Sequence, residues 1–190
     1  TGDYLMGKSH DLATLSDDGI SNLKVDTIKS TGGTTAMTVD SSGRVLRSVL
    51  PAWRIGLNTN QTLTSAGPHK VTFNTTSGSN CFLQGGVTHN NGTITVPVAG
   101  LYQLNAHMRI DDVSASYYII LYIQKNQVDS GLNQGYFIVD EHGPSYHTMV
   151  GTELFQCQAG DELECYIYVQ SDGNWHVEAG RSLFSGFLVG

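Results

Sequence analysis

Adjacent carboxylates are the side chains of this sequence that come nearest to a pair of acid and base catalysts. They occur as Asp111-Asp112, Asp140-Glu141 and Asp161-Glu162. Neighbouring residues of a strand point to opposite faces of a sheet, so adjacency does not bring two carboxylates onto one substrate. The sequence also contains no G-x-S-x-G, no H-E-x-x-H and no glycine-rich phosphate loop between a strand and a helix. We therefore expect a protein that is not an enzyme, in which these acidic residues are solvated in loops.

Histidines raise the question of a metal site. His142 and His147 stand in one polar stretch with Asp140 and Glu141, and a threefold axis would triple any single ligand. None of these residues has the spacing of a metal-binding motif. The sequence therefore predicts no metal site.

Two stretches combine aromatic rings with amides and carboxylates, a mixture typical of ligand sites and of interface hot spots. The first runs from Asp129 to Tyr146, and the second covers residues 171–178. Both are predicted to be loops. The candidate receptor-binding residues that they supply are Tyr136, His142, Tyr146, Asn174, Trp175 and His176. The alternative for Trp175 is that it caps the core or packs on a neighbouring subunit.

The acidic balance of the chain excludes partners that need a basic surface. Lys and Arg number 10 against 17 Asp and Glu, and the formal net charge is −7. Nucleic acid and anionic membrane surfaces are bound through clustered positive charge. No apolar run is long enough to span a bilayer, and no signal peptide is recognisable. Three cysteines are expected to be free and buried, with a Cys157–Cys165 disulfide as the alternative.

The stretch 93–110 shows the alternation of a β-strand most clearly. Its second half places every other residue on one apolar face, namely Tyr102, Leu104, Ala106, Met108 and Ile110. Pro97 and Gly100 mark a corner before that strand. The 22 Gly and the few helix formers favour an all-β protein. Strands are expected at 51–57, 71–74, 93–96, 101–110, 116–125, 146–155, 161–170 and 182–189, which predicts a two-sheet sandwich or jelly roll of eight to ten strands.

Two of these expected strands, 116–125 and 161–170, carry apolar or aromatic side chains on both faces. A single sandwich has only one interior, so the second face is predicted to be buried against another subunit, where tyrosine is enriched. The predicted trimer-interface residues are Tyr118, Ile120, Tyr122, Tyr166, Tyr168 and Phe184. The alternative is an exposed tyrosine-rich face.

Residues 1–49 are predicted to form an extended N-terminal stalk. Short patterned segments there alternate with the turn-forming stretches 30–34 and 40–43. One chain carries too few apolar side chains for a core, but three chains around one axis would pool Val25, Ile28, Met37, Val39, Val45 and Leu46. The alternative is a flexible linker. Residues 24–28 and 33–45 resemble the stalk-to-head segment of tail-fibre proteins of tailed bacteriophages.

Residues 51–190 resemble the globular head of complement component C-one-q, a jelly roll of the tumour-necrosis-factor-like superfamily. Five ordered segments carry the resemblance, at 51–53, 71–74, 91–102, 159–163 and 184–189. It implies a ten-stranded jelly-roll head over residues 50–190, a compact homotrimer, and both termini at one end. Ile94 stands where the family usually has an aromatic residue, and no collagen-like Gly-X-Y run precedes the head.

A phage-like stalk in place of collagen favours a viral fibre over a complement-type protein. The two resemblances imply a trimeric virion protein, assembled in the host cytoplasm and joined to other virion proteins through its N-terminal segment. The head would bind a host-surface receptor, either a glycan or an outer-membrane protein. The alternatives are a decoration fibre with a purely structural role and a polysaccharide-degrading tail spike. No cofactor is expected, although some relatives bind calcium at the head.

Overall fold

All described residues lie in strands, turns or irregular segments, so the all-β prediction is confirmed. The computed structural model describes residues 26–47, 49–78, 80–113, 118–127, 134–139 and 145–189. Within these ranges there is no helix long and apolar enough to cross a membrane. The chain divides into two compact units, Thr1–Arg47 and Ser48–Gly190, which we call the N-terminal unit and the C-terminal unit. The sequence placed this boundary between residues 49 and 50.

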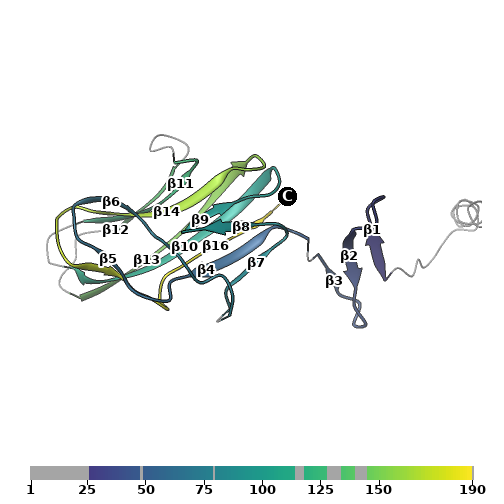
Figure 1. Ribbon diagram of the computed structural model, residues 1–190, viewed down its shortest axis with the longest axis horizontal. Helices are drawn as coiled ribbons and strands as arrows, with labels where there is room; N and C mark the ends of the chain where they lie inside the picture. Colours follow the sequence, from purple (N-terminus) through teal and green to yellow (C-terminus); the bar gives the residue numbers. More distant parts are fainter. Residues whose placement is uncertain are drawn as a thin grey trace, which may run out of the picture. The chain divides into compact units, whose positions relative to one another are not determined.

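The N-terminal unit contains a small antiparallel sheet in the order β1-β2-β3 (Figure 1). Its strands are β1 (Thr27–Lys29), β2 (Thr35–Val39) and β3 (Val45–Leu46). Asp40 organises the turn before β3, because its carboxylate accepts hydrogen bonds from the backbone N–H groups of Ser42 and Arg44 and from Arg44 Nε. The hydrogen bonds from Arg44 hold the pKa of Asp40 below its ordinary value.

The apolar side chains of the N-terminal unit lie at its surface. Three of the predicted stalk-core residues are exposed, with exposed fractions of 47–57%: Ile28, Val45 and Leu46. Two more, Met37 and Val39, are half-buried, and Val25 lies outside the described residues. One copy of this unit therefore makes no core from its described apolar residues.

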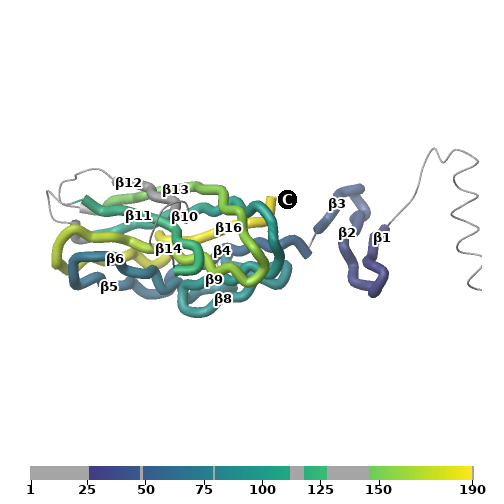
Figure 2. Tube along the Cα trace, turned by 90° about the horizontal axis from the view of Figure 1, so that it is seen from above, coloured from purple at the N-terminus to yellow at the C-terminus, as the bar shows by residue number. Residues whose placement is uncertain are grey.

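The C-terminal unit is a sandwich of two sheets, seen along their length in Figures 1 and 2. The first, which we call the β10 sheet, contains β5 (Gln61–Leu63), β15 (Trp175–Val177), β10 (Gly100–Val113), β16 (Leu183–Leu188), β4 (Ala52–Gly56) and β7 (Phe82–Gln84), with β13 (Ser145–Cys157) paired to β10. The second, the β14 sheet, contains β12 (Gln134–Val139), β11 (Ile119–Lys125), β14 (Glu162–Val169), β9 (Thr93–Thr95) and β8 (Thr88–Asn90), with β6 (Gly67–Lys70) paired to β14.

The core lies between the two sheets and follows the alternation seen in the sequence. The inward side chains of β10 are fully buried: Tyr102, Leu104, Ala106, Met108 and Ile110. From the β14 sheet they meet an equally buried set that includes Leu121, Ile123, Leu163 and Ile167. Burial of a side chain of this size stabilises the fold by about 1.5–3 kcal/mol. The predicted apolar face of β10 is thus confirmed.

Aromatic rings fill one part of this core. Trp53 lies edge-on to Phe184, with ring centroids 5.7 Å apart, and it also contacts Tyr102 at 6.1 Å. Phe184 stacks on Phe73 at 6.3 Å. Phe184 is 0% exposed in one chain, so its predicted place in a trimer interface is wrong. It pairs with Ala106 in register, and the pleat therefore turns its ring inward.

Three predictions of local structure are also corrected. Residues 71–74 are not a strand but cross between the sheets, since Val71 N–H donates to Cys165 of β14 and Asn74 N–H donates to Gly56 of β4. Strands β12 and β15 lie inside the two stretches predicted to be loops. The cysteines are free as predicted, which excludes the Cys157–Cys165 alternative; Cys157 and Cys165 are buried as predicted, whereas Cys81 is half-buried. Burial raises the pKa of Cys157 to about 11.

Both ends of the C-terminal unit lie together at one end of the sandwich (Figure 1). Leu188 N–H donates to the Pro51 carbonyl at 2.9 Å, and Val189 N–H donates to Leu101 at 2.8 Å. From Tyr102 the strand β10 runs away from this end to Asp111. At about 3.3 Å per residue, Tyr102 and Asp111 are roughly 30 Å apart.

Candidate functional site

Strand β10 changes its neighbour where it approaches the end of the sandwich opposite the termini. As far as His107 it pairs with β16, and at Ile110 and Asp111 it pairs with β15 instead. On its other side it pairs with β13 along its whole length. The outward side chains of three strands, β10, β13 and β15, therefore meet in this region.

Five outward side chains gather there, and we call them the Tyr146 cluster: Arg109, Asp111, Tyr146, His176 and Glu178. The Arg109 guanidinium lies over the Tyr146 ring, 4.1 Å from its centroid. Arg109 Nε is 2.8 Å from Glu178 Oε2, and His176 Nδ1 is 3.2 Å from Asp111 Oδ1. The four charged or titratable side chains are each 21–25% exposed, so solvent screens these pairs only in part.

The backbone fixes this cluster in place. Arg109 N–H donates to Ser182 Oγ at 3.1 Å, and Glu178 N–H donates to the Arg109 carbonyl at 2.8 Å. Strand pairing sets His176 directly opposite Asp111. The side chains therefore need little reordering when a ligand binds.

Three polar atoms of the cluster are buried without a hydrogen bond among the described residues. They are Arg109 Nε, Asp111 Oδ1 and Glu178 Oε2. The Arg109–Glu178 contact is short enough for an ion pair, but it lacks the alignment of a hydrogen bond. Buried polar atoms are satisfied in the great majority of cases, and the exceptions concentrate at functional sites. A Tyr ring that is 58% exposed, beside carboxylate side chains that are 21–24% exposed, matches the C–H face and the hydroxyl groups of a sugar.

Two of the predicted receptor-binding residues belong to this cluster. Tyr146 comes from β13 and His176 from β15, and Arg109 lies between these strands. Asn174 is exposed directly before β15. The prediction that Trp175 binds a receptor is wrong, and the alternative that it caps the core is confirmed: it is 1% exposed, and its Nε1–H donates to the Ser171 carbonyl at 3.2 Å. Because residues alternate along β15, an outward His176 requires an inward Trp175.

The other two predicted binding residues do not join the cluster. Tyr136 is on β12, opposite Tyr122 of β11 and thus in the other sheet. The side chain of Tyr136 and the whole of His142 lie outside the described residues, as do Asp140 and Glu141 of the predicted polar loop. The described residues contain no group of three or more His, Cys, Asp or Glu that could hold a metal ion.

The sequence missed Arg109, Asp111 and Glu178 as site residues. Asp111 was assigned to a loop, but it lies on β10 and faces outward. The signal was present, since Arg109 alternates with the inward residues Met108 and Ile110. The sequence could not show that β15 replaces β16 as the neighbour of β10 at this point. This change of neighbour brings Glu178 to Arg109 and His176 to Asp111.

The tyrosine-rich face predicted as a subunit contact lies outward on the β14 sheet. Its rings stack in pairs across β11 and β14, Tyr118 on Tyr168 at 5.7 Å and Tyr122 on Tyr166 at 5.4 Å. Tyr118 is 38% exposed, and Ile120, Tyr166 and Tyr168 are half-buried. The prediction that Tyr122 lies in a subunit contact is wrong, because Tyr122 is only 4% exposed in a single chain. The stacks cover much of this face without a partner.

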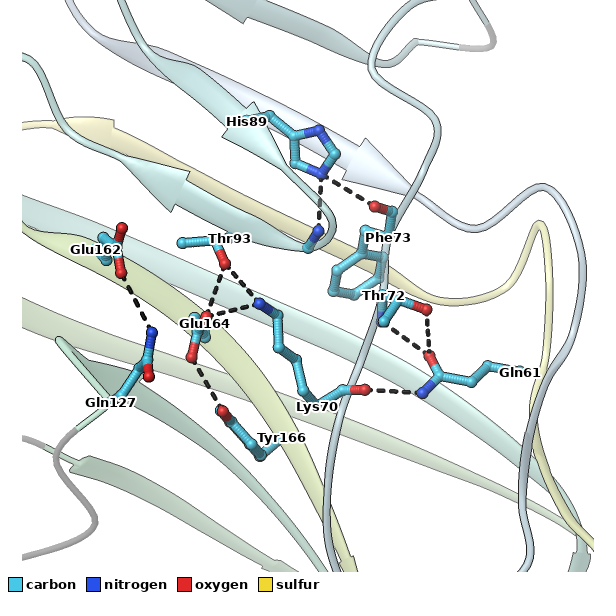
Figure 3. A network of polar contacts seen from close by, with 11 residues as sticks. Gln61, Lys70, Thr72, Phe73, His89, Thr93, Gln127, Glu162, Glu164 and Tyr166 are labelled. Atoms are coloured by element: carbon cyan, nitrogen blue, oxygen red, sulfur yellow. Dashed lines mark hydrogen bonds and ion pairs between the residues drawn. The ribbon is translucent and has the colours of Figure 1, made fainter.

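A buried ion pair lies beside these rings (Figure 3). Glu164 is 1% exposed and accepts hydrogen bonds from Lys70 Nζ and Thr93 Oγ1, each at 2.7 Å, and from the Tyr166 hydroxyl at 3.0 Å. Burial alone would raise the pKa of Glu164, but the hydrogen bonds from Lys70, Thr93 and Tyr166 and the Lys70 charge outweigh it and lower that pKa. This carboxylate is saturated with donors, which marks it as structural.

No family model matches this chain, and no curated protein matches it.

Proposed function

We propose that this chain is a non-enzymatic, homotrimeric fibre protein of a tailed bacteriophage, and that its C-terminal unit binds a glycan on the host surface. The observation that carries the proposal is the Tyr146 cluster. It offers an exposed ring and partly exposed carboxylate side chains at the end of the sandwich opposite the termini. A receptor site belongs at that end if residues 1–49 join the unit to the virion.

Two surfaces support a trimer with a jelly-roll head. The N-terminal sheet exposes Ile28, Val45 and Leu46, which three copies would bury together. On the outward face of the β10 sheet, Val150, Leu154 and Phe187 are 72%, 54% and 44% exposed. Leu154 and Phe187 flank Gln103 on opposite sides, so these apolar groups share one face. We assign the subunit contact to this apolar patch (Val150, Leu154 and Phe187).

A trimer would make weak sites effective. Three copies of the Tyr146 cluster on one rigid particle convert a modest single-site affinity into firm adsorption, because each later contact is intramolecular. The acidic chain, with its net charge of −7, favours a glycan with neutral sugars at this cluster.

Binding to intact bacteria tests the proposal. The fluorescently labelled full chain is incubated with a panel of bacterial strains, and isolated surface polysaccharide is added as competitor. We expect saturable binding to some strains and a loss of about tenfold or more for Tyr146→Ala, since stacking of this kind contributes on the order of 1–3 kcal/mol. Val98→Ala is the matched control, because Val98 is 43% exposed near the opposite end.

Other outcomes select the alternatives. Binding to no strain would favour a decoration fibre with a purely structural role. Release of sugar fragments from the polysaccharide by the purified chain would make it a tail spike. Equal binding by Tyr146→Ala and the unmodified chain would remove the cluster from the site.

A further inference from the structure

A cavity of 420 Å³ opens on the outward face of the β10 sheet, and none of the five side chains of the Tyr146 cluster lines it. Its floor is formed where Gly56 of β4 pairs with Leu183 of β16. Gly56 contributes no side chain, and this leaves the space above the sheet open. Its size falls within the range of about 300–1,000 Å³ that is usual for small-molecule sites. Strand β4 lies three strand spacings from β13, roughly 14 Å, so the cavity is also distinct from the centre of the apolar patch.

Backbone hydrogen bonds hold the walls of this cavity in position. Gly56 and Thr75 exchange both backbone hydrogen bonds, at 3.0 and 2.9 Å. Asn58 N–H donates to Asn74 Oδ1 at 2.9 Å, and Gly180 N–H donates to the Leu57 carbonyl at 3.1 Å. The cavity is therefore preformed, which lowers the cost of ordering it around a ligand.

Arg54 supplies the only formal charge among the described residues that line the cavity. Its side chain is half-buried, and within the described part of the chain its guanidinium makes no hydrogen bond and no ion pair. An unpaired guanidinium in a recess of an acidic protein attracts an anion. Its planar fork matches the two oxygens of a carboxylate better than an ammonium would.

The remaining lining groups fit a sugar ring. Ala179 and Leu183 offer apolar contact for the C–H face of the ring, and Asn58 and Thr75 offer an amide and a hydroxyl for its hydroxyl groups. We propose that the cavity binds a uronic acid, a sugar that carries a carboxylate, with that carboxylate paired to Arg54. This site goes beyond the receptor site proposed above, whose Asp111 and Glu178 would repel such a ligand.

Titration with galacturonate tests this assignment on the full chain. Saturation-transfer NMR and calorimetry would measure its binding, with galactose as the neutral comparator and inorganic phosphate as the anion without a sugar ring. We expect galacturonate to bind at least about tenfold more tightly than either, because a charge-assisted fork and the ring contacts act together. Arg54→Gln should abolish the binding. Arg181→Gln removes the same charge from an exposed residue beside the cavity and should leave it unchanged.

Several results would overturn the proposal. No binding of galacturonate by the unmodified chain, or equal binding of galactose or phosphate, excludes a uronic acid site. An equal loss in Arg54→Gln and Arg181→Gln would mean that only net charge matters. A fall in particle mass in Arg54→Gln, with no galacturonate binding by the unmodified chain, would assign the cavity to a second copy of the chain. Because cell adsorption is measured separately, failure here leaves the receptor proposal intact.

Discussion

Glu164 and Asp111 show how the surroundings of a carboxylate decide its role. Both lie on the outward face of a strand, and both have a basic or titratable neighbour. Glu164 accepts hydrogen bonds from three side chains, so its capacity is used within the fold. Asp111 Oδ1 is buried and accepts none from the described residues. The first carboxylate stabilises the protein, whereas the second, paired only with His176 among the described residues and 21% exposed, keeps part of its surface open to a ligand.

Removal of the Lys70 ammonium tests the structural role of Glu164. Lys70→Met leaves a carboxylate that is 1% exposed without its cation. We expect a loss of about 3 kcal/mol in the free energy of unfolding. This value is at the lower end of the range for breaking a buried ion pair, because Lys70 itself is 26% exposed. Urea unfolding at fixed chain concentration measures it. Lys125→Met is the control: its 3.8 Å pair with Asp161 is looser, and we expect a loss below about 1 kcal/mol. Equal losses would contradict the distinction.

The same carboxylate predicts how stability depends on pH. The pKa of Glu164 is lower in the folded protein than its ordinary value of 4.5. Its contribution is therefore complete above pH 4.5 and is lost as the pH falls through the lowered folded pKa. We expect the thermal midpoint of unfolding of the unmodified chain to decrease as the pH is lowered through this acidic range. The midpoint of Glu164→Gln should decrease less steeply. Parallel pH profiles of the two proteins would show that other groups control acid unfolding.

At the scale of single elements, alternation along the strands could be predicted and pairing could not. The inward face of β10 follows from Tyr102, Leu104 and Met108 alone, because an apolar period of two has one structural solution. The short strands β12 and β15 were hidden, since their three to six residues carry too little pattern to distinguish them from loops. Trp175 is the clearest consequence: a Trp between polar residues has the composition of a binding loop, and strand pairing turned it inward.

Gly186 of β16 shows packing that sequence patterns do not reveal. A Cβ atom at this position would lie 2.4 Å from Trp53 Cζ2 and 2.9 Å from Leu104 Cδ2. We expect Gly186→Ala to cost about 1–3 kcal/mol, measured by urea unfolding, because the Trp53 ring must move within a close-packed core. Gly56→Ala is the control in the same sheet, since its Cβ would meet ordinary contacts at 3.5 and 3.6 Å. In a chain that already carries Trp53→Phe, Gly186→Ala should lower the free energy of unfolding by less. An unchanged loss would exclude the Trp53 ring as its cause.

At the scale of the whole molecule, the two proposed sites and the apolar patch divide one outward sheet face among them. The Tyr146 cluster lies at the end away from the termini, the Arg54 cavity lies over β4 and β16, and the patch includes Val150 and Leu154 of β13. By contrast, stacked tyrosines and the Glu164 network cover the outward face of the β14 sheet. The β10 sheet is therefore the face on which association and ligand binding would be coupled.

Light scattering on the full chain tests that assignment. We expect a particle of three times the chain mass of 20.5 kDa at micromolar concentration. Val150 is 72% exposed in one chain, so Val150→Glu should leave each chain folded, but in a trimer it would place three unpaired carboxylates in an apolar contact and lower the mass. Thr88→Glu adds the same charge at an exposed residue of the β14 sheet and should remain trimeric. If the unmodified chain is a monomer, the trimer proposal is wrong. If Val150→Glu is still a trimer, the subunit contact lies on another face.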